Sequence, residues 1–311
     1  MAVAAALVCG CEKELKVSDD EPDDESTEMV VNGPGKRFTF TVKGDFVSPT
    51  FADGDVRPDA DASVVGSASA GRRASTYLTD GSNQMTDLWV FDFVGETCVQ
   101  SLHQTTSDEA WGQPQMSLAL GTHHIYFVAS RGVTPTVNTT ARTITWSSVR
   151  DTYWKDYEVT VVNTSNGNRA VTLDRVVAKL KLTINDEIPA GASTLTCTPA
   201  SWHYGLNYTT GAPVAATNGQ AITISVPTSY IGTIGQLSAS FFTFSGADEW
   251  TTNVSLAVKD GNSNALGSVA ISDVPLKRNR STEYSGNLFS SGGNMTVSID
   301  DSWTSPYIGT W

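Results

Sequence analysis

The chain has 311 residues, of which 17% are charged and 40% are hydrophobic, and its formal net charge at pH 7 is −13. This acidic balance excludes electrostatic docking on nucleic acid or on an anionic membrane surface. Because so few residues are charged, the surface polarity has to come from Ser, Thr, Asn and Gly, a composition typical of extracellular β-proteins. The length allows two domains of ordinary size or one large domain.

The first eleven residues, MAVAAALVCGC, form a short apolar segment that ends at a cysteine. A lipoprotein signal has the same order: a hydrophobic run, small residues, and then the cysteine that is acylated. Cys11 fits this position better than Cys9, although no Lys or Arg precedes the apolar run. We therefore predict a signal peptide over residues 1–11 and acyl chains such as palmitate on Cys11. The alternative is a frayed apolar terminus, since so short a run cannot span a bilayer.

An acidic segment follows this cysteine. Residues 12–28 hold nine acidic and two basic residues, which account for more than half of the net charge. A segment of this composition cannot bury enough apolar surface to offset its ordering entropy. We predict a disordered tether over residues 12–35.

Alternation of apolar and polar residues with period two is the dominant pattern in the rest of the chain. In KRFTFTVKG, Phe38, Phe40 and Val42 alternate with polar residues, which predicts a first strand buried on one face. The stretches 87–94 and 121–130 are apolar on both faces, which is typical of central strands. The best helical candidate, 148–159, is short and is expected at the periphery. The pattern therefore predicts an all-β, antiparallel protein made of two sandwiches.

A turn cluster, TSNGNR, marks the expected boundary between the two sandwiches. We place the first domain at 36–168 and the second, with a short tail, at 170–311. Cys98 and Cys197 then lie in different domains, where two buried thiols are favoured over a disulfide.

The first domain contains one long connection, residues 47–76, without sustained alternation. A structureless connection of this length is uncommon inside a compact domain and is often functional. It carries Arg72 and Arg73 in the stretch SAGRRAS. These two arginines are either a solvated pair or a processing site for a trypsin-like protease. A cut there would leave the first strand attached by hydrogen bonds and packing alone.

No motif for catalysis, cofactor binding or metal binding is present in the sequence, so we predict a protein that is not an enzyme. His123 and His124 are adjacent in a predicted strand and point to opposite faces, so they cannot chelate one ion together. Trp202, Tyr204 and Tyr208 lie near a turn. Trp202 and Tyr204 are expected in the core because of their alternating spacing, and the alternative is that the three aromatics form an exposed platform on which sugar rings stack.

Four stretches, taken in order, resemble the fimbrillin superfamily of Bacteroidales, the subunits of lipoprotein-derived surface pili. They are DLWVFDFVGETCVQSL, MSLALGTHHIYFVAS, LDRVVAKLKLTI and VPLKRNRSTEYSGNLF. The third matches through Arg175, Ala178 and Lys179. The fourth matches through residues that include Arg278 and Asn279. Ser130 replaces an asparagine of the family pattern. The order and spacing of the four stretches agree with the family pattern across most of residues 30–301.

The resemblance implies two transthyretin-like sandwiches in tandem and a lipoprotein at the outer membrane and cell surface, within a fimbria. It implies removal of the first strand after cleavage at a basic residue, and strand addition from other fimbrial subunits. The physics agrees, because a missing strand exposes backbone groups and apolar pockets that a new strand satisfies.

The role within such a fibre stays open among stalk, tip and anchor. The last ten residues offer Trp303, Tyr307, Ile308 and Trp311 as anchors for pockets of a neighbour, but Pro306 interrupts them. The alternative function is a surface-tethered lipoprotein that binds a glycan or a host or bacterial surface protein through loop aromatics.

Overall fold

The computed structural model describes residues 35–44, 78–80, 83–165, 167–235, 237–290 and 294–300. Strands make up most of this part of the chain, and its one helical element is the 3-10 turn η1, Thr228–Tyr230. The prediction of an all-β protein built from antiparallel sandwiches is confirmed. Among the described residues, no helix is long and apolar enough to cross a membrane.

The strands are numbered in chain order. Those of the first half are β1 Lys36–Gly44, β2 Thr79–Asp80, β3 Asn83–Gln84, β4 Asp87–Val94, β5 Thr97–Thr105, β6 Gln115–Leu118, β7 Gly121–Ser130, β8 Thr136–Asn138, β9 Thr143–Thr145, β10 Thr152–Val161 and β11 Asn168–Arg175. Those of the second half are β12 Val177–Ile184, β13 Ala192–Pro199, β14 Trp202–Asn207, β15 Ala212–Thr217, β16 Ile222–Ser225, β17 Leu237–Phe244, β18 Trp250–Asp260, β19 Ala265–Leu276, β20 Ser281–Asn287 and β21 Asn294–Asp300.

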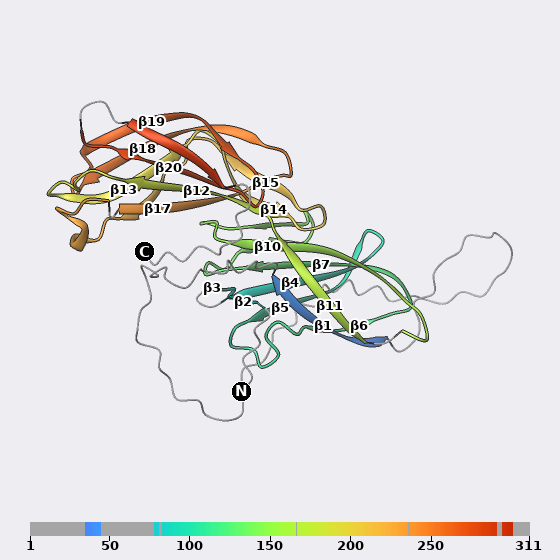
Figure 1. Ribbon diagram of the computed structural model, residues 1–311. Coiled ribbons are helices and arrows are strands. Elements are labelled where there is room, and N and C mark those ends of the chain that lie inside the picture. The colour runs from blue at the N-terminus through green and yellow to red at the C-terminus, as the bar shows by residue number, and fades with distance from the viewer. Residues whose placement is uncertain are drawn as a thin grey trace, which may run out of the picture.

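The first domain is one sheet that folds over itself, in the order β5-β4-β7-β10-β11-β1-β6. The sheet bends between β10 and β11, which share only two paired positions, Tyr153–Arg175 and Trp154–Asp174. The layer β11-β1-β6 therefore packs against the layer β5-β4-β7-β10, and apolar side chains of both layers fill the space between them. Figure 1 shows this domain below the second one.

The central strands β4 and β7 are buried on both faces, which explains why their sequences are apolar throughout. Leu88 and Val90 of β4 face the layer that contains β1, whereas Phe91 and Phe93 face the second domain. On that second face, the Phe91 ring stacks on Tyr208 with 4.0 Å between ring centroids. The prediction that 87–94 and 121–130 are central strands is confirmed by their pairing on both sides.

The expected helix at 148–159 is wrong, because this segment contains most of β10. β10 pairs with β7 over ten positions, from Thr152–Ser130 to Val161–Gly121. The segment is also not peripheral, because Tyr153 is fully buried in the core of the first domain. Long-range pairing with β7 overrides the weak local pattern.

The second domain is a sandwich of the sheets β17-β12-β20-β21 and β16-β13-β18-β19. A third sheet, β15-β14-β9-β8, joins the two halves of the chain, because β9 pairs with β14 over Thr143–Asn207 to Thr145–Gly205. The expected boundary also needs correction. Residues 170–175 belong to β11 and hence to the first domain, so the second domain begins near Val176.

Candidate functional site

The first strand, β1, lies between two strands and not at the edge of its sheet (Figure 1). It runs parallel to β11 over Thr39–Gly44 and antiparallel to β6 over Lys36–Thr39. Two residues that precede β6 continue this pairing: the Phe40 N–H donates to the Pro114 carbonyl and the Val42 N–H donates to the Gly112 carbonyl, both at 3.0 Å. Hydrogen bonds therefore hold β1 on both sides for most of its length.

Alternate side chains of β1 fill the core of the first domain. Phe38, Phe40 and Val42 are all 0% exposed, as the alternation predicts. The Phe40 ring meets the ring of Phe127 edge to face at 5.4 Å and that of Tyr157 at 6.0 Å. Without β1, the pockets for these three side chains would open to solvent along the gap between β11 and β6.

The neighbouring backbone approaches β1 closely at Gly167, just before β11. A Cβ atom at this position would collide with the carbonyl oxygen of Arg37. Glycine is therefore required for β11 to come within pairing distance of β1. The Arg169 guanidinium also covers the Phe38 ring, 5.1 Å from its centroid.

Several predicted site residues lie outside the described part of the chain. These are Cys11, Arg72 and Arg73, and the tail residues Trp303, Tyr307, Ile308 and Trp311. What the structure does place is β1 itself, whose covalent link to the rest of the domain runs through residues 45–77.

A buried histidine supports the strand that pairs with β1. His123 Nδ1 lies 2.8 Å from Asp92 Oδ1, and its Nε2 lies 3.1 Å from the carbonyl oxygen of Ala119, the residue that follows β6. A neutral imidazole donates through one nitrogen only, so two acceptors call for the doubly protonated ring. The hydrogen bond and charge of Asp92, with the Ala119 carbonyl, raise the pKa of His123 against the effect of burial.

We expect this ion pair to make stability depend on pH. Because the pKa of His123 is raised above its ordinary value of 6.5, the native state keeps a proton that the unfolded state releases. The stabilisation by the His123–Asp92 pair is therefore complete below the ordinary pKa of 6.5. It is lost as the pH rises through the pKa of His123 in the folded state. Urea unfolding between about pH 6 and pH 8.5 should therefore show falling stability in the wild type and a flatter profile in His123→Gln.

The control for this experiment is His124→Gln. His124 points to the opposite face, as predicted, and its Nδ1 lies 3.2 Å from Asp156 Oδ1 at the surface. Because the His123 pair is buried and the His124 pair is solvated, His123→Gln should flatten the profile more than His124→Gln does. A His123→Gln profile parallel to that of the wild type would contradict the assignment.

The residues that carry the family resemblance meet where the two domains join. Arg175, at the end of β11, donates from Nε and Nη2 to the two carboxylate oxygens of Asp151 at 2.8 and 3.0 Å. Its Nη1 donates to Asn279 Oδ1 in the second domain at 3.1 Å. Asn279 has a positive φ of 57°, a conformation that asparagine tolerates well. Arg175 and Asn279 therefore link the two domains.

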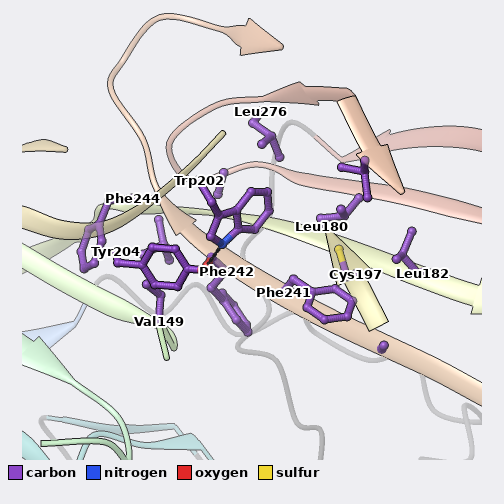
Figure 2. Packing of buried hydrophobic residues seen from close by; sticks show 14 of the residues in the cluster. Val149, Leu180, Leu182, Cys197, Trp202, Tyr204, Phe241, Phe242, Phe244 and Leu276 are labelled. Atoms are coloured by element: carbon purple, nitrogen blue, oxygen red, sulfur yellow. Dashed lines mark hydrogen bonds between the residues drawn. The ribbon is translucent and has the colours of Figure 1, made fainter. Parts of the chain in front are cut away.

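The aromatic residues considered as a sugar platform lie in the core, which overturns that alternative. Trp202 and Tyr208 are 0% exposed and Tyr204 is 7% exposed. Figure 2 shows Trp202 enclosed by other apolar side chains, with its Nε1–H donating to the Phe242 carbonyl at 2.9 Å. A ring without an exposed face cannot stack on a sugar.

Metal-ligating groups and the two cysteines of the described residues were the other candidates. No group of three or more metal-ligating side chains occurs among the described residues. Cys98 and Cys197 form no disulfide, as predicted. Burial raises the pKa of the Cys197 thiol to about 12, so it is unreactive at neutral pH. Cys98 is partly exposed, so the prediction of a buried thiol is wrong at that position.

The fold and the junction define this chain as a two-domain β-sandwich protein whose domains share one sheet. The model of a family of unknown function, DUF6562, matches residues 131–310, and the chain belongs to this family. The matched region begins before β8 and includes the junction residues described above. No curated protein sequence matches the chain.

Three of the solved structures to which the chain is similar are proteins of Bacteroides, Parabacteroides and Porphyromonas species. A candidate adhesin from Bacteroides ovatus has 13% identity and a TM-score of 0.46, covering 89% of this chain and 95% of its own. A fimbrial assembly protein from Parabacteroides distasonis has 14% identity and a TM-score of 0.44, covering 86% and 99%. The tip fimbrial protein Mfa3 from Porphyromonas gingivalis, with C-terminal truncation, has 14% identity and a TM-score of 0.41. The match covers 70% of this chain and 94% of Mfa3. Similarity at this level carries no conclusion about what this chain binds.

Proposed function

We propose that the chain is a structural, non-catalytic subunit of a cell-surface fibre that assembles by exchange of β1. The observation that carries the proposal is the way in which β1 is held in the first domain. This strand fills the core with Phe38, Phe40 and Val42, yet residues 45–77 alone connect it covalently to the rest of its domain. After a single cut in that connection, only hydrogen bonds and side-chain packing would hold β1 in its domain, so the strand could dissociate.

Loss of β1 would strongly favour the binding of a replacement strand. The parallel edge of β11 and the short edge of β6 would each present unpaired N–H and C=O groups, beside an open apolar groove. A strand with apolar residues at every second position satisfies both needs at once. Because the groove and the incoming strand are different surfaces, the contact does not close on itself and grows a filament.

The partners that fit this groove are other fimbrial subunits. In the tail, Tyr307 and Trp311 are four residues apart with Gly309 between them, the same spacing as Phe38 and Val42. This spacing would allow the tail to enter the groove of a neighbour with two large side chains. Lipidation at Cys11 would hold the uncut chain on the outer membrane, and a cut at Arg72 or Arg73 would release it from the lipid.

Limited trypsin digestion of the folded chain tests this proposal. We expect one early cut at Arg72 or Arg73, followed by loss of the fragment that contains β1. The remaining fragment should then form oligomers, which size-exclusion chromatography with light scattering would detect. A labelled synthetic peptide of residues 35–44, added in excess, should bind the remaining fragment and suppress the oligomers.

The matched control is the double variant Arg72→Ala with Arg73→Ala, which should lose the early cut and stay monomeric under the same conditions. The proposal fails if the nicked wild-type chain releases its N-terminal fragment and the remainder neither oligomerises nor binds the peptide. It fails equally if β1 stays in place after the cut.

A further inference from the structure

A polar cleft at the domain junction is not used in strand exchange. It has a volume of about 290 Å³ and lies between the end of β11 and two loops of the second domain. Its lining consists of Asp174, Arg175, Ala247, Lys277, Arg278 and Asn279. Two domains thus contribute to it, which is a common position for ligand sites.

The lining carries more positive than negative charge. Arg175 is neutralised by Asp151, and Asp174 is paired with Lys155 at 2.9 Å. Among the described residues, by contrast, neither Lys277 nor Arg278 has a carboxylate within ion-pair distance. Among the described residues, these two cations therefore have no ion-pair partner, and the Asp174 carboxylate, which is itself paired with Lys155, acts on Arg278 only from beyond ion-pair distance.

The position of Arg278 is fixed by neutral groups. Its Nε donates to the Ser245 carbonyl at 3.1 Å, and its Nη2 donates to the Gly211 carbonyl. These bonds orient the guanidinium without neutralising it, and the side chain is half-buried. A partly desolvated cation interacts more strongly with an anion than a fully solvated one does. Within the described residues, the guanidinium is therefore oriented and partly desolvated without a carboxylate in direct contact with it.

We propose that this cleft binds a single oxyanion group, a carboxylate or a sulfate, through Lys277 and Arg278. A guanidinium held in one orientation forms charge-assisted hydrogen bonds to such a group, and the neighbouring ammonium adds a second positive charge. The net charge of −13 opposes the approach of anions at long range, so the attraction comes from these local cations. We expect dissociation constants on the order of millimolar, and binding independent of whether β1 is exchanged.

Isothermal titration of the uncut chain tests the proposal, with sodium chloride used to keep the ionic strength constant. The probes are sulfate, glucuronate and glucose. Sulfate represents a free inorganic anion, glucuronate an acidic sugar, and glucose its neutral analogue. Sulfate and glucuronate should bind saturably, and glucose should not bind. Tighter binding of glucuronate would assign the ligand to acidic sugars, and equal binding would assign it to the oxyanion group alone.

Lys277→Gln should weaken the binding of both anions about tenfold, the effect of losing one charge-assisted hydrogen bond. Lys277→Arg should restore it. The control Lys259→Gln removes a cation of β18 outside the cleft and should bind as the wild type does. The proposal is overturned if the wild type shows no saturable binding of either anion. It is also overturned if Lys277→Gln and Lys259→Gln bind equally well.

Discussion

Replacing Phe40 by alanine should lower the free energy of unfolding by about 3–5 kcal/mol, the range for removing a buried phenylalanine side chain. Phe40 is 0% exposed and contacts aromatic rings from three directions, those of Phe38, Phe127 and Tyr157. The surrounding strands are tied to one another by backbone hydrogen bonds, so the cavity cannot collapse freely. Urea unfolding followed by tryptophan fluorescence would measure the loss.

Thr41→Ala provides the comparison on the same strand. Thr41 points away from the core and is half-buried, so its removal should cost well below the loss at Phe40. Similar losses in the two variants would mean that β1 is not anchored through its inward side chains. In the trypsin experiment, Phe40→Ala should also release the β1 fragment faster than Thr41→Ala does. The difference arises because Phe40→Ala removes the packing that holds the middle of β1 in the core, whereas Thr41→Ala does not.

The fold class could be predicted from local patterns. In Lys36–Gly44, one face is buried and the other is polar, and period-two alternation reports that difference directly. In β4 and β7 both faces are buried, so the apolar runs indicated central strands. Their second face, however, belongs to a core cluster shared with the opposite half of the chain, in which Phe91 stacks on Tyr208. Only the type of element could be predicted, because the identity of the covering layer is a long-range property.

The errors also arise from long-range pairing. Nothing in the local sequence of β10 shows that ten residues of β7 lie beside it. The boundary was placed at a turn cluster, but β11 lies beyond that turn and pairs back with β1. The pairing of β9 with β14 also cannot be predicted from local sequence, since the two strands are more than fifty residues apart in the chain.

The candidate site could be predicted in part. Its three buried residues, Phe38, Phe40 and Val42, followed from the pattern, but the parallel pairing with β11 did not. The support from His123 was missed as well. The signal that could have found it is a polar residue in an apolar strand together with Asp92 in another, since buried charges occur in pairs. Sequence alone cannot show that the two are opposite each other.

The junction between the domains should be as sensitive to mutation as the core. Asp151→Asn keeps the shape of the side chain but leaves the Arg175 guanidinium buried without its counter-charge. Both side chains are at most 3% exposed, so water cannot compensate. Removing one partner of such a pair typically costs about 3–5 kcal/mol. Because Arg175 also contacts Asn279 of the second domain, calorimetry should show weaker coupling between the unfolding of the two domains.

A surface ion pair nearby gives the matched control. Lys155 Nζ lies 2.9 Å from Asp174 Oδ2, with 38% and 55% of the two side chains exposed. Lys155→Gln should therefore cost at most about 1 kcal/mol and leave the calorimetric transition unchanged. Equal costs for Lys155→Gln and Asp151→Asn would show that the buried pair contributes no more than a solvated one. The position of the second domain would then depend on the apolar contacts, such as that of Phe91 with Tyr208, and on the shared sheet.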